Sequence, residues 1–291
     1  MSIYNIIMGH VPVKDGSRSS LAAPSAYYLT NNLGKTTDGV YWIDLPTAGP
    51  TQVYCILDPA INGGGWMMAM KSTRGTTFNY TANYWNTINT LNPTQNNRND
   101  GDAKFNTMNY FQSKDIMALW PDITTVGGGL GSGSSNKFSS WTWLENDFYA
   151  GSRTTLVDFF NTAGTYNSGT VNTAGNYGGY YKGFAKNSPN WGNGVFSSQT
   201  DINFYGFNFK NYPGSNAKVR WGFGWNENGE GNYTSPATLA NAAGGYSGSD
   251  DVSGGIGMDS SYGNYSSGDY LACCNDTTGI NRSARVEIYV R

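Results

Sequence analysis

Charge is scarce in this sequence of 291 residues. Charged residues make up only 13% of it, and 18 basic residues against 20 acidic ones give a net charge of -2. No block of like charge occurs, which argues against a nucleic-acid-binding face or a basic membrane-binding face. Nor does any segment approach the roughly 18 consecutive apolar residues that a membrane-spanning helix needs. We therefore expect no nucleic-acid partner and no membrane span.

Cysteine is almost as rare. The chain has three cysteines, and two of them, Cys273 and Cys274, are adjacent. Neighbouring cysteines rarely bridge each other because the ring is strained, so a framework of disulfides cannot be built. The apolar patch at residues 3–8 follows no basic segment and is too short for a secretory signal peptide. The sequence thus favours synthesis in a reducing cytoplasm and predicts that Cys55 is a buried free thiol.

Groups for catalysis are also few. The single histidine, His10, lies near the N-terminus, and nucleophilic mechanisms need a base beside the nucleophile. The glycine runs lack the spacing of a dinucleotide-binding loop. Glu145 and Asp147 are the least implausible carboxylate pair for glycoside cleavage, and this alternative stays open. We expect a protein that is not an enzyme.

What the sequence does contain is glycine, with 39 residues, and aromatic side chains, at 15%. This composition argues against a disordered chain and against a helical bundle, and it favours a strand-rich fold with long ordered loops. Helices are expected at 115–120, 154–162 and 236–243. The final strand alternates, which predicts a half-buried strand with Arg285, Glu287 and Tyr289 on one face. The expected strands are 40–45, 52–57, 66–71, 202–210, 217–225 and 284–290.

The first 24 residues lack strong strand signals. They are either an attachment arm or a frayed terminus. The apolar residues at their start are too few to form a core, so in an arm they would pack against another chain or the rest of an assembly; they are Ile3, Ile6, Ile7 and Met8. Residues 25–291 contain no charged or proline-rich linker and are expected to form one domain.

Several motifs carry a resemblance. The run "DGVYWIDLPTAGPTQVYCILDPAINGGGWMMAM" resembles the opening of a fibrinogen-like domain, in which Gly-Val-Tyr-x-Ile precedes Val-Tyr-Cys and Gly-Gly-Gly-Trp. The segments "VRWGFGWNENGEGNY", "GGIGMD" and "SARVEIYVR" are more similar to the intelectin branch, the X-type lectins. The resemblance implies an α+β, strand- and loop-rich fold with a twisted, mostly antiparallel sheet, few short helices and long ordered loops. The disulfides of that family, and the histidine that intelectins place near the sugar, are missing here.

The resemblance also implies a Ca²⁺ site, because such lectins hold the sugar through a calcium ion bound by an acidic, amide-rich loop. Oxygen donors on flexible turns suit Ca²⁺. Neither loop here has EF-hand spacing, and ordinary turns and caps are the alternative. An arginine such as Arg220 or Arg282 beside Glu227 could replace the ion. The candidate ligands are Asn226, Glu227, Asn228 and Glu230 in one loop, and Asp250, Asp251 and Asp259 in a second.

Aromatic residues among glycine, serine and asparagine are typical of recognition loops, because tyrosine offers a large contact area at little entropic cost. Most such residues are instead expected to form the cores of their own loops, and Tyr262 and Tyr265 are the exceptions. The candidates for ligand binding are Trp225, Tyr233, Tyr246, Tyr262 and Tyr265.

A fold that lacks its family's disulfides suits a virion protein, which is made in a host cytoplasm and exposed after lysis. Homo-oligomerisation and metal binding could then replace the missing disulfides. The chain also resembles C-terminal domains of bacteriophage and other viral structural proteins. We therefore expect a tail fibre, head fibre or decoration protein at the virion surface that binds a host glycan or receptor. The alternatives are a purely structural assembly subunit and a free cellular lectin.

Overall fold

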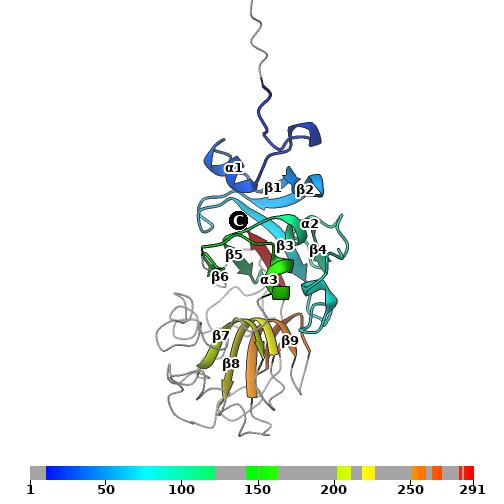
Figure 1. Ribbon diagram of the computed structural model, residues 1–291, viewed down its shortest axis with the longest axis vertical. Coiled ribbons are helices and arrows are strands. Elements are labelled where there is room, and N and C mark those ends of the chain that lie inside the picture. Colours follow the sequence, from blue (N-terminus) through cyan, green and yellow to red (C-terminus); the bar gives the residue numbers. More distant parts are fainter. Residues whose placement is uncertain are drawn as a thin grey trace, which may run out of the picture.

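The computed structural model describes residues 11–121, 142–149, 151–162, 202–210, 218–226, 251–259, 264–270, 282–283 and 285–291. In these residues the chain forms two antiparallel sheets and a few short helices (Figure 1). The expectation of a strand-rich class with few short helices is confirmed at this level, whereas the fibrinogen-like fold stays a prediction. Within the same residues, no helix is long and apolar enough to cross a membrane.

The first sheet has the strand order β1-β2-β3-β12-β5-β6, with β4 also paired to β3. Its last strand in the sequence, β12, lies between β3 and β5, so the C-terminal strand is central in the sheet (Figure 1). The strands are β1 Gly39–Leu45, β2 Gly49–Ile56, β3 Trp66–Ser72, β4 Ala103–Lys104, β5 Ile116–Leu119, β6 Thr142–Glu145 and β12 Val286–Val290.

The second sheet has the order β11-β10-β9-β8-β7 and lies at the end of the molecule opposite to residues 11–24 (Figure 1). Its strands are β7 Ile202–Lys210, β8 Lys218–Asn226, β9 Asp251–Asp259, β10 Ser267–Tyr270 and β11 Arg282–Ser283. The helices are α1 Ala26–Asn31, α2 Asn106–Tyr110 and α3 Leu156–Thr162, with 3₁₀ turns η1 Ser19–Leu21 and η2 Asn83–Trp85.

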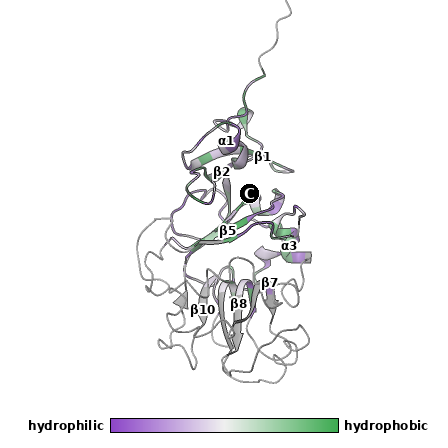
Figure 2. Cartoon of the chain, turned by 90° about the vertical axis from the view of Figure 1, so that its left-hand side faces the viewer, coloured by the Kyte–Doolittle hydropathy of each residue, from purple (hydrophilic) through white to green (hydrophobic). Residues whose placement is uncertain are grey.

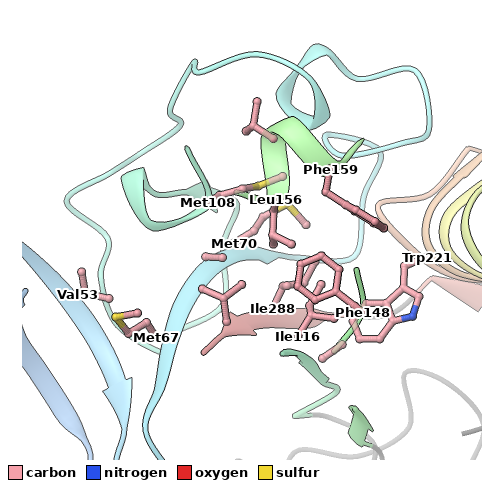
Figure 3. Close-up of a cluster of buried hydrophobic side chains, with 14 of the residues drawn as sticks. Val53, Met67, Met70, Met108, Ile116, Phe148, Leu156, Phe159, Trp221 and Ile288 are labelled. Atoms are coloured by element: carbon pink, nitrogen blue, oxygen red, sulfur yellow. The ribbon is translucent and has the colours of Figure 1, made fainter. Parts of the chain in front are cut away.

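One hydrophobic cluster includes side chains from both sheets. Phe207 of β7 stacks on Trp221 of β8, with ring centroids 5.3 Å apart. Phe159 of α3 meets Phe207 and Phe148 edge to face, at 4.9 Å in each case. Figure 3 shows Phe148 and Trp221 meeting beside Ile116 of the first sheet, and α3 lies between the two sheets in Figure 2. Aromatic packing therefore joins the sheets.

Most of the expected elements are present. All six predicted strands form, five of them with shifted ends and the one at 202–210 with the predicted bounds, and α3 lies within the predicted helix 154–162. The helix predicted at 115–120 is wrong, because this segment is β5, whose four residues are all buried. The half-buried final strand is also wrong, since every residue of β12 is buried, Glu287 included. The helix predicted at 236–243 lies outside the described residues.

Glycine is required between β2 and β3. Gly63, Gly64 and Gly65 all have positive φ, at 84°, 68° and 76°. A Cβ on Gly64 would lie 2.6 Å from the Leu57 carbonyl oxygen, and one on Gly65 would lie 2.8 Å from the Cα of Tyr27. The turn can therefore pack under α1 only because these positions have no side chain.

Cys55 of β2 is fully buried and is a free thiol, as the sequence predicts. Burial raises the pKa of this thiol, and the nearby Asp38 carboxylate raises it further. The two other cysteines, Cys273 and Cys274, lie outside the described residues. In the part of the chain that is described, cysteine thus serves as a small apolar core residue.

The N-terminal segment contacts β1 from Gly16 onwards. The Trp42 amide donates to the Gly16 carbonyl, and the Ala23 amide donates to the Trp42 carbonyl, both at 2.9 Å. Ala23 is fully buried, whereas Val11 and Val13 are 83% and 51% exposed. The division of the chain at residue 24 stays a prediction. The expected assembly residues lie outside the described residues; they are Ile3, Ile6, Ile7 and Met8.

Candidate functional site

Most of the predicted metal ligands belong to one connection in the second sheet. β8 and β9 are antiparallel neighbours, and their register places Asn226 opposite Asp251. The connection 227–250 therefore begins and ends at adjacent backbone positions. The candidate oxygen donors at the start of the connection and those at its end are far apart in the sequence, but both groups adjoin neighbouring strand ends. Its remaining candidates lie outside the described residues; they are Glu227, Asn228, Glu230 and Asp250.

Asp251 and Asp259 were expected in a loop, and the structure shows otherwise. They are the first and last residues of β9, which has nine residues. At about 3.3 Å per residue their backbones are about 26 Å apart, whereas the ligands of Ca²⁺ lie within about 2.6 Å of the ion. One ion therefore cannot bind both. Asp259 instead pairs with Lys218, its register partner, at 3.6 Å.

The glycines of β9 explain why this strand was missed. Gly255 has a φ of 141°, and a Cβ there would lie 2.7 Å from the Cα of Gly222 in β8. A Cβ on Gly257 would lie 2.9 Å from the ring of Trp85. Glycine disfavours strands in general, so a glycine-rich segment predicts a loop. Here it lets β9 lie close to β8 and η2.

The candidate aromatic residues do not all lie at one end of the sheet. The backbone of Trp225 pairs with Ile202 and Val252, near the Asn226–Asp251 end. Tyr265 is half-buried at the other end, where its carbonyl accepts from the Met258 amide at 2.8 Å. The structure thus separates Trp225 from Tyr265. The remaining candidates, Tyr233, Tyr246 and Tyr262, lie outside the described residues.

Arg220 of β8 contacts the long loop that follows β3. Its Nε donates to the Tyr80 carbonyl at 2.8 Å, and its guanidinium lies 4.2 Å from the centroid of the Tyr80 ring. A second nitrogen donates to Oδ1 of Asn208 at 2.8 Å. Burial lowers the pKa of Arg220. These contacts hold the Arg220 guanidinium about 20 Å along β8 from Asn226. Glu227 lies outside the described residues, so the arginine that the sequence offered as its partner in place of calcium stays a prediction.

The carboxylate pair considered for glycoside cleavage lies at a turn. Glu145 ends β6, and Asp147 follows it with a φ of 57°. The Asp147 carboxylate accepts from the Gly151 amide at 2.6 Å and lies 3.9 Å from Nζ of Lys114. Its contacts are those of a residue that closes a turn.

Among the described residues, no group of three or more histidine, cysteine, aspartate or glutamate side chains is placed to hold a metal ion. The connection 227–250 lies outside the described residues, so calcium binding there stays a prediction.

A buried charged cluster was missed by sequence reasoning. Lys71 of β3, Arg285 and Glu287 of β12 are 1%, 6% and 0% exposed. Arg98 reaches the cluster from the asparagine-rich segment 92–102 and donates to Glu287 at 2.8 Å. The alternating sequence of β12 suggested that one of its faces is exposed to solvent, but the segment 92–102 covers that face. A signal was available, because Lys71 and Glu287 are isolated charges of opposite sign in two apolar strands.

No family model matches the chain, and no curated protein matches it. The resemblance to fibrinogen-like and intelectin domains therefore stays a prediction from the motifs of the chain.

Proposed function

We propose that this chain is a non-enzymatic virion surface protein that binds a host glycan through Ca²⁺ held by the connection between β8 and β9. The observation that supports the proposal is the Asn226–Asp251 pairing, which draws the two ends of the connection together. Six candidate oxygen donors then belong to one closed segment; they are Asn226, Glu227, Asn228, Glu230, Asp250 and Asp251.

The charge of this segment also supports a cation. Residues 227–250 include Glu227, Glu230 and Asp250, but no lysine, arginine or histidine. Like charges in a segment with fixed ends repel one another, and a bound cation offsets that repulsion. Ca²⁺ accepts carboxylate, amide and carbonyl oxygens in a flexible geometry. Tyr233 and Tyr246 in the same connection would supply the aromatic contacts to a sugar.

The position of the connection fits receptor binding. β8 and β9 contact the loop after β3 through Arg220 and Gly257. These two residues are far along their strands from the ends, Asn226 and Asp251, where the connection begins and ends. The second sheet lies at the opposite end of the molecule from residues 11–24 (Figure 1). A virion protein attached through its N-terminal arm would present this sheet to the host.

Calcium titration by calorimetry, together with glycan-array binding with and without a chelator, tests the proposal. We expect Glu227→Gln to lose calcium binding and sugar binding together. The matched control is Asp259→Asn, which removes a carboxylate from the far end of β9 and should leave both unchanged. If chelator and Glu227→Gln change neither melting nor sugar binding, the calcium site is refuted. If no sugar binds under any condition, a structural assembly subunit is the better assignment.

A further inference from the structure

Lys71 is a buried amine held against an asparagine side chain. Its Nζ donates to Oδ1 and to the carbonyl of Asn97, both at 3.0 Å, and to the carbonyl of Asn99 at 2.9 Å. The residue is only 1% exposed, because the segment 92–102 covers the end of β3. The amine therefore lies next to one particular side-chain carboxamide.

The Asn97 carboxamide is polarised by its surroundings. Besides the lysine, the backbone N–H of Asn99 donates to the same Oδ1 at 2.9 Å. A backbone donor in this position stabilises the negative charge that develops on a carbonyl oxygen when a nucleophile attacks its carbon. These hydrogen bonds make the carboxamide carbon of Asn97 more electrophilic.

A carboxylate lies opposite the lysine on the neighbouring strand. Glu287 of β12 is the register partner of Lys71 and is fully buried. Directly opposed residues in antiparallel strands have Cβ atoms about 5 Å apart, so the two side chains share one face of the sheet. Arg285 donates to one oxygen of Glu287 at 3.0 Å, and Tyr289 donates to the other at 2.8 Å. These contacts fix the carboxylate in place.

Burial favours the reactive form of the lysine. Removal from water lowers the pKa of Lys71, and the positive charge of Arg285 lowers it further, whereas Glu287 acts in the opposite direction. A lower pKa increases the fraction of neutral amine, which is the nucleophile.

We propose that Lys71 and Asn97 form an intramolecular isopeptide bond, with Glu287 transferring the proton. Glu287 takes a proton from the Lys71 ammonium, and the neutral Nζ attacks Cγ of Asn97. The Nζ–Cγ bond forms, the negative charge on Oδ1 is stabilised by the Asn99 N–H, and the Cγ–Nδ2 bond then breaks. Glu287 returns its proton to Nδ2, which leaves as ammonia, and the extra proton on Nζ passes to that ammonia, which becomes an ammonium ion. The sum is one ammonium group and one carboxamide giving one secondary amide and one ammonium ion, with no oxidant or other reactant.

The bond would join β3 to the segment 92–102 across 26 positions of sequence. A cross-link of this kind stabilises a fold mainly by restricting the unfolded chain, as a disulfide does. It would serve a chain whose strand cysteine, Cys55, is a free thiol. The proposal is independent of calcium and sugar binding.

Intact mass measured under denaturing conditions tests it on the full chain. The wild-type protein should be lighter than its sequence by about 17 Da, the mass of one ammonia lost in the aminolysis. Proteolysis should then yield a branched peptide that contains both Lys71 and Asn97. The variants Lys71→Arg and Asn97→Ala should show the full sequence mass, and Lys71→Arg keeps the positive charge and its donors.

The matched control is Lys104→Arg. Lys104 is also fully buried, but its Nζ donates to the backbone carbonyl of Thr87 rather than to a side-chain carboxamide. This variant should keep the mass deficit. Circular dichroism confirms that each variant is folded before its mass is compared.

Glu287→Gln should slow the loss of ammonia after refolding at neutral pH, because the proton acceptor is absent. If this variant does not fold, Lys71→Arg and Asn97→Ala still decide the question. Folded wild-type protein that keeps the full sequence mass after prolonged incubation overturns the proposal, and so does a deficit that persists in Asn97→Ala.

Discussion

Lys71 and Lys104 lie on neighbouring strands, and their surroundings differ. Lys71 has a cross-strand carboxylate, Glu287, and three oxygen acceptors. Lys104 donates to the Thr87 carbonyl at 2.5 Å, and burial lowers its pKa from 10.5 to about 7. The segment that Lys104 holds is also fixed by Asn109, whose amide donates to the Ile88 carbonyl at 2.8 Å. A buried amine thus anchors a loop in both places.

The low pKa of Lys104 predicts how stability depends on pH. Between pH of about 7 and 10.5 the unfolded chain keeps the lysine proton and the folded chain has released it. The free energy of unfolding should therefore rise with pH across this window. Lys104→Met should flatten that rise, which urea unfolding at pH 7, 8 and 9 would measure. The half-exposed Lys114→Met is the control and should keep the slope, and an unchanged slope in Lys104→Met would contradict the low pKa.

At the scale of elements, the turn before β3 makes a sharp prediction. Gly65 and Gly34 both have positive φ, at 76° and 66°, but only Gly65 faces another backbone, that of Tyr27 in α1. An alanine at Gly34 bears only the conformational cost, about 1 kcal/mol. At Gly65 the new Cβ would also clash with the backbone of Tyr27. Because this clash adds to the conformational cost, Gly65→Ala should lower the free energy of unfolding by about 2–4 kcal/mol. Equal losses in the two variants, measured by denaturant unfolding, would show that α1 moves aside freely.

Local pattern predicted the elements whose residues are typical of their class. β1, β2 and β3 have β-branched or aromatic residues between turn-formers, so their places were found. β5 was missed because four consecutive buried residues have no period, and a short apolar run fits a helix or a strand equally well. β9 was missed because its glycines are explained only by the closeness of β8. Both errors concern long-range packing, which a sequence window does not contain.

The candidate site was predicted only in part, because its geometry also depends on contacts between segments that are distant in the sequence. Asn226 and Asp251 were both proposed from their chemistry, but their pairing is a property of the β8–β9 register. The same register shows that Asp259 belongs elsewhere, beside Lys218. The Lys71–Asn97 contact was not foreseen, because nothing in the local sequence places an asparagine of segment 92–102 over a residue of β3.

At the scale of the whole molecule, the sheets are held together by aromatic rings and by a short segment after β9. Ser266 donates through its backbone to the Gly75 carbonyl at 2.7 Å, and its hydroxyl accepts from the Phe78 amide at 2.8 Å. The indole of Trp120 donates to the hydroxyl of Ser267 at 2.9 Å. Because these bonds join the segments that follow β3 and β5 to the start of β10, we expect the described residues to unfold cooperatively.

The N-terminal segment gives the last prediction, since its two parts have different contacts. Residues 16–23 bond to β1 and bury Ala23, whereas Val11 and Val13 are exposed. Removal of residues 2–13 should therefore keep the melting temperature and abolish self-association, if the apolar start of the chain packs against another copy. Removal of residues 2–23 should lower the melting temperature as well, because the edge of β1 loses its hydrogen bonds. Light scattering and thermal melts separate the two effects. If the chain that lacks residues 2–13 still self-associates, the N-terminal arm is not the assembly segment.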